Sequence, residues 1–155
     1  MKRTDLAAII ASQPLFVGVP DVAALVAGCA HNAVFARGER IFAEGDAADH
    51  LYLLRRGRVA LELASPRGPL IIETLQPGEA LGWSWLFPPY RWSADARALE
   101  PAGAIVVDAD CLRNKAEADP SFGYELMRRL SAPIVAQLHA TQVRLLDLYG
   151  DVRRV

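Results

Sequence analysis

Short apolar runs separated by glycine-containing turns fill the middle of the chain, and they constrain its fold more than any other feature. From Asn32 to Asp108 each run is only a few residues long, and glycine or proline follows most of them. Evenly spaced runs of this kind are typical of an antiparallel sandwich or barrel, and glycine supplies the positive φ that tight turns require. The expected strands are residues 33–36, 41–43, 50–54, 59–63, 70–75, 94–99 and 104–108.

Helical patterns flank this region, so we expect a mainly β protein with flanking helices (α+β). Pro20 suits the first turn of one helix, Asp110 could cap another, and Asp119-Pro120 is typical of a helix start. Pro133 is expected to restart or kink the last helix. The expected helices are residues 4–12, 20–30, 110–118, 119–130 and a final segment. The expected domains are an N-terminal helix (1–14), a β-roll with flanking helices (15–118) and a C-terminal helical segment (119–155).

The final helix carries an apolar stripe at heptad-like spacing. A partner helix could cover this stripe, which predicts a homodimer through the C-terminal helix. The alternative is one amphipathic helix lying on its own sheet. The predicted dimer residues are Ile134, Leu138, Thr141, Leu145 and Leu148.

Charge and composition exclude several classes of protein. The formal net charge of −1 gives no general attraction to nucleic acid or to an anionic membrane. No signal peptide is apparent and no apolar segment is long enough to span a membrane. Cys29 and Cys111 lack the CxxC spacing, so we expect buried thiols in a reducing compartment and a cytoplasmic protein.

All three tryptophans lie within one segment, residues 78–98, where the strands give way to a loop. Two prolines, a tyrosine and Arg91 accompany them. A loop with this much apolar surface either packs as a lid over the core or lines a pocket.

The stretch from Arg37 to Val59, RGERIFAEGDAADHLYLLRRGRV, resembles the "G-E-x-I-F-x-x-G-D … Y-x-I-x-x-G-x-V" roll of the cyclic nucleotide-binding domains found in the catabolite activator protein and FNR-like regulators. Pro77-Gly78-Glu79 followed by Gly82 is similar to that family's "P-G-D-x-F-G" turn. The resemblance covers roughly residues 15–149. It implies a jelly-roll of the cyclic nucleotide-binding type with a long C-terminal helix, in a bacterial-type sensor of regulatory function.

The resemblance also implies a ligand site in the loop after Gly82. In the family, a glutamate directly after this glycine accepts a bond from the ribose 2′-hydroxyl, and an arginine before two small residues neutralises the cyclic phosphate. Trp83 stands in place of the glutamate and Trp92 in place of the arginine, with Arg91 one position early. Losing both charged partners removes about 3–6 kcal/mol, which is about two to four decades of affinity.

Three interpretations of the loop remain open. The indoles could fill the vacated pocket and plug it, line a pocket for a flatter or more apolar ligand, or leave room for Arg91 to supply the missing cation in a genuine cyclic-nucleotide site. The candidate ligand-binding residues are Gly82, Trp83, Ser84, Trp85, Arg91, Trp92, Ser93, Ala94 and Thr141. No cofactor is expected, and a cyclic nucleotide is a doubtful ligand.

The sequence does not predict an enzyme or a metal site. His31, His50 and His139 are scattered and do not form the His-x-His cluster of metal-binding β-barrels, and no GxSxG, Walker A or GxGxxG motif occurs. DNA-binding relatives carry a helix-turn-helix after the last helix, whereas this chain ends at Val155 with only Arg153-Arg154 as a basic end. We therefore expect no direct nucleic-acid binding and no membrane partner. A small molecule or a protein is the expected partner of a stand-alone module.

Overall fold

The computed structural model of the chain describes residues 3–150. The basic end Arg153-Arg154 lies outside these residues. Within this described part, four helices and seven strands follow one another in the order α1, α2, β1 to β7, α3, α4. The helices are α1 (Arg3–Ala11), α2 (Pro20–Ala27), α3 (Ala109–Ala118) and α4 (Pro120–Tyr149). The strands are β1 (Ala30–Phe35), β2 (Arg40–Phe42), β3 (His50–Arg56), β4 (Val59–Leu63), β5 (Leu70–Leu75), β6 (Asp95–Ala98) and β7 (Ala102–Asp108).

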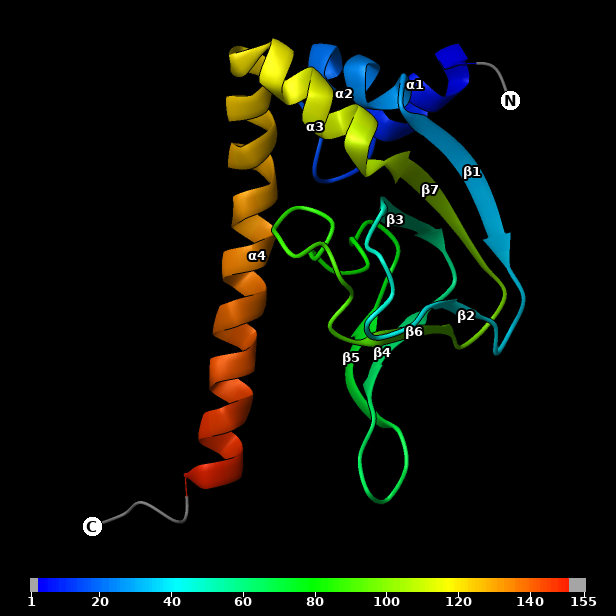
Figure 1. The fold of residues 1–155 in the computed structure, drawn as a ribbon, viewed down its shortest axis with the longest axis vertical. Coiled ribbons are helices and arrows are strands. Elements are labelled where there is room, and N and C mark those ends of the chain that lie inside the picture. The colour runs from blue at the N-terminus through cyan, green and yellow to red at the C-terminus, as the bar shows by residue number, and fades with distance from the viewer. Residues whose placement is uncertain (1–2, 151–155) are drawn as a thin grey trace.

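The strands form two antiparallel sheets, which confirms the predicted mainly β fold with flanking helices. One sheet has the order β1-β7-β3 and the other β2-β6-β4-β5. Side chains from both sheets share one core, with Leu53, Val59 and Ile105 fully buried. Helices α1 to α3 gather at one end of this roll, while α4 runs along its side (Figure 1).

Each expected strand is present, but β1 and β7 begin earlier than their apolar runs. The two strands pair with each other from Ala30↔Val107 to Phe35↔Ala102. This long-range pairing extends β1 over His31 and Asn32, whose polar side chains concealed the strand in the sequence. Pairing with a distant partner therefore sets these boundaries more than local composition does.

The expected restart of the helix at Pro133 is wrong, because α4 runs from Pro120 to Tyr149, 30 residues in all, with Pro133 inside it. A proline inside a helix removes one backbone hydrogen bond, and here the helix continues beyond it. At the start of α4, the Asp119 carboxylate accepts a bond from the Phe122 N–H, as the Asp-Pro pair predicts. For α3, however, the capping side chain is Asp108 rather than Asp110, since Asp108 Oδ1 accepts from the Cys111 N–H at 2.7 Å.

Cys29 and Cys111 form a disulfide bond, so the expectation of two free thiols is wrong. The two residues lie 82 positions apart in the sequence. The pairing of β1 with β7 brings the residue before β1 beside the first turn of α3, and no local spacing rule detects such a contact. The expected reducing compartment rested on free thiols, so the disulfide removes the basis for it.

Helix α4 buries apolar side chains only in its first part, within the residues that the structure describes. Its buried side chains are Phe122, Leu126 and Leu130, and all lie before Pro133. Beyond this residue the helix passes beside the loop after β5 (Figure 1). The space between this part of α4 and the roll forms the groove described below.

Candidate ligand-binding site

The indole of Trp92 packs inside the roll. Only 4% of the residue is exposed, and its ring stacks on Phe42 with centroids 3.8 Å apart and planes inclined by 7°. A Cβ atom on Gly82 would lie 3.2 Å from the Trp92 ring, and Gly82 has a φ of +91°. Both the backbone conformation and the close approach of the ring favour glycine at this position.

Arg91 lies on the outside of the molecule, next to this buried ring. Its Nη1 donates to the carbonyl of Gly45 at 3.3 Å, and the residue forms a β-bridge with Ala47. The Trp92 N–H donates to the Asp46 carbonyl at 2.9 Å, which fixes the extended backbone here. Because neighbouring side chains of an extended segment point to opposite faces, the arginine faces solvent where the tryptophan faces the core.

Trp85 is fully buried beneath α3 and α4. Its carbonyl accepts a bond from Arg113, whose guanidinium also lies 4.2 Å from the centre of the Tyr90 ring. Its Nε1 has no hydrogen-bond partner among the groups that the structure describes. Trp85 and Leu86 border a small pocket of about 320 Å³ between the loop and these two helices.

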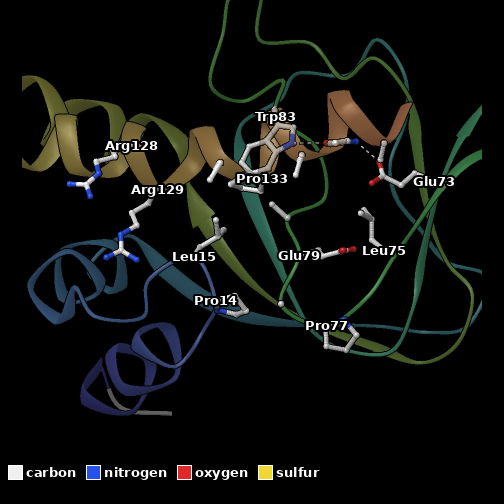
Figure 2. Close-up of a pocket in the computed structure, with 16 residues that line it drawn as sticks. Pro14, Leu15, Glu73, Leu75, Pro77, Glu79, Trp83, Arg128, Arg129 and Pro133 are labelled. Carbon is white, nitrogen blue, oxygen red and sulfur yellow. Dashed lines mark hydrogen bonds between the residues drawn. The ribbon is translucent and has the colours of Figure 1, made fainter. Parts of the chain in front are cut away.

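Trp83, in contrast, points toward α4. Its Nε1 donates to the side-chain carbonyl of Gln137 at 3.0 Å, and Gln137 Nε2 donates in turn to the carboxylate of Glu73. Figure 2 shows this chain of contacts, which joins the loop, α4 and β5. The three tryptophans of one loop therefore have three different environments, and only Trp83 combines partial exposure with a contact to α4.

A groove of about 750 Å³ lies between the roll and α4, with Trp83 on its wall. Leu75, Ala80, Pro133 and Ala136 contribute apolar surface. Charged side chains also line it. These are Glu73, Glu79, Arg128 and Arg129. Figure 2 places Glu73 at one end of the groove, the two arginines at the other, and Glu79 between them.

The two carboxylates influence each other. Burial and the nearby charge of Glu79 raise the pKa of Glu73, while Arg144 and the Gln137 hydrogen bond act in the opposite direction without cancelling the effect. In the roll, burial together with the charge of Asp49 raises the pKa of Tyr52, whose ring lies tilted beside that of Trp92. Tyr52 therefore keeps its proton at neutral pH.

The structure does not bring all the candidate residues together. Gly82 and Trp92 meet in the roll, Trp83 lines the groove, and Ser84 is half-buried in the same loop. Ser93 is exposed and Ala94 is buried. Thr141 is exposed, and its hydroxyl donates to the Gln137 backbone carbonyl at 2.9 Å.

Sequence reasoning missed Glu73, Glu79 and Gln137. On α4, the groove is lined by side chains that follow one helical face, namely Arg128, Arg129, Ala132, Pro133, Ala136, Gln137 and Ala140. Their helical spacing could have indicated this face. The stripe on another face of the helix is more apolar and gives the stronger sequence pattern. Glu73 is the charged residue of β5, a strand that is otherwise apolar apart from Thr74, which is a second signal.

Within residues 3–150, no group of three or more His, Cys, Asp or Glu side chains is arranged to hold a metal ion. Among the helices that the structure describes, none combines the length and apolar content of a membrane span.

Residues 33–119 match the profile of the cyclic nucleotide-binding domain. The chain belongs to this family. It is 29% identical over 147 residues to the CRP-like cAMP-activated global transcriptional regulator of Mycobacterium tuberculosis, a match that covers 93% of this chain. The chain spans 64% of the length of that relative.

Solved structures of the family share the fold. A putative cyclic nucleotide-binding protein from Geobacter metallireducens has a TM-score of 0.75 at 27% identity, and the match covers 90% of this chain and 99% of that protein. The catabolite activator protein of Thermus thermophilus has a TM-score of 0.70 at 26% identity, with 88% and 63% covered. The predicted family and its roll are thereby confirmed, and the family is a regulatory one.

Proposed function

We propose that the chain is a regulatory ligand-sensing module in which the anchor for a cyclic phosphate is lost and the ligand binds in the groove beneath α4. The observation that carries this proposal is the Trp92 ring stacked on Phe42 inside the roll. The sequence resemblance assigns this position to the arginine that neutralises the phosphate. A buried indole offers neither a positive charge nor space for an anion.

The second family anchor is altered as well. Trp83 occupies the position of the ribose-binding glutamate, and its N–H is engaged by Gln137. Arg91 could replace the missing cation only if the backbone bonds around Asp46 were broken. The loss of both anchors supports an affinity for cyclic nucleotides that is lower by about two to four decades.

The groove supports a ligand-dependent change because three elements meet there. A ligand beside Trp83 would compete with or strengthen the contacts that Gln137 makes to the loop and to Glu73. A ligand that prefers one position of α4 shifts the population toward that position. The readout would therefore be the orientation of α4.

The outer surface of α4 supports a homodimer as the form that carries this readout. Its exposed apolar side chains include Val135, Leu138, Leu145, Leu146 and Leu148. A second copy of the chain offers a complementary helix, and apolar side chains at heptad spacing favour such a pair. With a net charge of −1, we propose a protein contact rather than nucleic acid as the output, and no catalytic activity.

Titration calorimetry with cyclic AMP and cyclic GMP tests the proposal. We expect no saturable heat in the micromolar range for either nucleotide. Micromolar binding of either one would contradict the loss of the phosphate anchor.

A second candidate function is a ligand-free interaction module. The burial of both Trp85 and Trp92 favours it, because these rings fill space that a ligand would need. The two functions differ in the groove, since a module without a ligand should leave the environment of Trp83 unchanged when small molecules are added.

A further inference from the structure

We propose that the groove beneath α4 selects an organic cation attached to a flat apolar ring, which is the opposite charge from that of a cyclic nucleotide. This inference rests on the proposed function, because it takes the groove as the ligand site.

The first support is the distribution of charge along the groove. Glu73 lies at the end beside Trp83, and Glu79 lies in the middle (Figure 2). The arginines at the far end are engaged elsewhere. Arg129 donates to the Val17 carbonyl at 2.8 Å and pairs with Glu125, and Arg128 also pairs with Glu125. The part of the groove next to Trp83 is therefore lined by carboxylates.

The second support is the way in which Glu73 is held. The amide of Gln137 accepts from Trp83 and donates to Glu73, so a carboxylate and an indole are fixed on the same side of the groove. An indole face attracts a cation through its quadrupole, and a carboxylate supplies the opposite charge. An ammonium or guanidinium group could use both.

Arg144 is close enough to Glu73 to act against the rise of its pKa, and it donates to the Ile72 carbonyl. The effects of burial and of Glu79 on the pKa of Glu73 exceed the opposite effect of Arg144, so this pKa is raised overall. A bound cation would relieve the repulsion between the carboxylates, whereas a phosphate would increase it.

The third support is size and apolarity. A groove of about 750 Å³ lies within the range of small-molecule sites, about 300–1,000 Å³. Leu75, Ala80 and Ala136 offer apolar wall for a ring next to the carboxylates. Apolar surface with a few fixed polar groups is typical of a site for a small organic molecule.

Three probes that share one ring and differ in charge test this inference: phenethylamine, phenethyl alcohol and phenylacetate. Tryptophan emission and calorimetry measure their affinity for the full chain. We expect the amine to bind saturably and at least about tenfold more tightly than phenylacetate. Equal or tighter binding of phenylacetate, or no saturable binding of the amine, would overturn the inference.

Variants connect the preference to the carboxylates. Glu73→Gln should lower the affinity for phenethylamine by about tenfold and leave the affinity for phenethyl alcohol unchanged, because only the amine loses a charged partner. Glu44→Gln, an exposed glutamate outside the groove, is the matched control and should change neither. If Glu73→Gln fails to fold by circular dichroism, Glu79→Gln provides the same comparison. An unchanged amine affinity in a folded variant would refute the charge assignment.

The outcome is distinguishable from a failure of the proposed function. Micromolar binding of cyclic AMP would contradict the proposed function itself, on which this inference rests. If neither phenethylamine nor a cyclic nucleotide binds, the proposed loss of the phosphate anchor stands and only the cationic ligand is rejected.

Discussion

Two tryptophans in one loop serve different purposes because the backbone directs them to opposite sides. Trp92 faces the core, where Phe42 and Tyr52 receive its ring. Trp83 faces α4 and contacts Gln137. The same residue type thus packs in the core in one case and lines the groove in the other.

Truncation of Trp92 should be costly for stability. Trp92→Ala removes a buried ring that stacks on Phe42, so the free energy of unfolding should fall by about 3–5 kcal/mol. Urea denaturation measures this change. Trp92→Phe, which retains an aromatic ring, should cost less. A loss below about 1 kcal/mol for Trp92→Ala would show that the ring is not packed in the core.

Glu73 should make stability depend on pH. Its pKa is raised in the folded protein, so the folded state binds more protons than the unfolded state above the unfolded pKa. Its contribution is fully present below the unfolded pKa and is lost as the pH rises through the folded pKa. Arg144, Glu79, Arg128 and Arg129 face the same region.

Glu73→Gln removes this titration. Between about pH 4 and about pH 7 the wild type should therefore lose stability that the variant keeps. The free energy of unfolding of the variant, relative to that of the wild type, should be higher at about pH 7 than at about pH 4. Urea denaturation at both pH values tests it. A difference that is constant or reversed would contradict the assigned repulsion.

At the residue scale, the replacement of both anchors by tryptophan follows from the sequence resemblance and stays a prediction, because it depends on the register after Pro77. The sequence could not predict the direction of each side chain. That direction follows from the pairing of Arg91 and Trp92 with residues 45–47, which are remote in the sequence.

At the scale of elements, α3 and its disulfide connect parts of the molecule that lie far apart in the sequence. The Cys29–Cys111 bond joins the start of β1 to α3, and Lys115 adds a bond to the Leu25 carbonyl at 2.8 Å. Arg113, on the same helix, holds the carbonyl of Trp85. Helix α3 therefore links α2 and β1 to the loop.

Loss of the disulfide should destabilise this arrangement. Cys29→Ser with Cys111→Ser should lower the free energy of unfolding by about 2–4 kcal/mol, because a long loop in the unfolded chain is no longer closed. Chemical denaturation with and without reductant provides the measurement. Insensitivity of the wild type to a reductant that fully reduces it would contradict the expectation.

Strands and helices were largely predictable at this scale because period and turn residues act locally. The strand from Val59 to Leu63 and the strand from Leu70 to Leu75 match the expected ranges. The continuity of α4 at Pro133 and the pairing of the cysteines depend on the surrounding structure, so local rules predicted them wrongly.

At the scale of the whole molecule, α4 has two faces with different surroundings. One face, with Pro133, Ala136 and Gln137, lines the groove. Another exposes Leu138 and Leu145. A helix that contacts a ligand on one side and a second copy on the other could transmit binding to assembly.

The predicted dimer is testable by sedimentation. At micromolar concentration the wild type should sediment at about twice the mass of one chain, and Leu145→Asp should reduce this to one chain by placing a charge in the interface. Val34→Asp, at an exposed valine of β1, is the control and should remain dimeric. A monomeric wild type would contradict the dimer.

Fluorine NMR on protein labelled with fluorotryptophan distinguishes a buried Trp92 and a groove-lining Trp83 from an open nucleotide pocket. Single Trp→Phe variants assign the three resonances. We predict that exchange of water for deuterium oxide shifts the Trp83 resonance but not those of Trp85 or Trp92, and that cyclic AMP moves none of them. A Trp92 resonance that is sensitive to solvent and shifts with cyclic AMP would show an open nucleotide pocket and contradict the account.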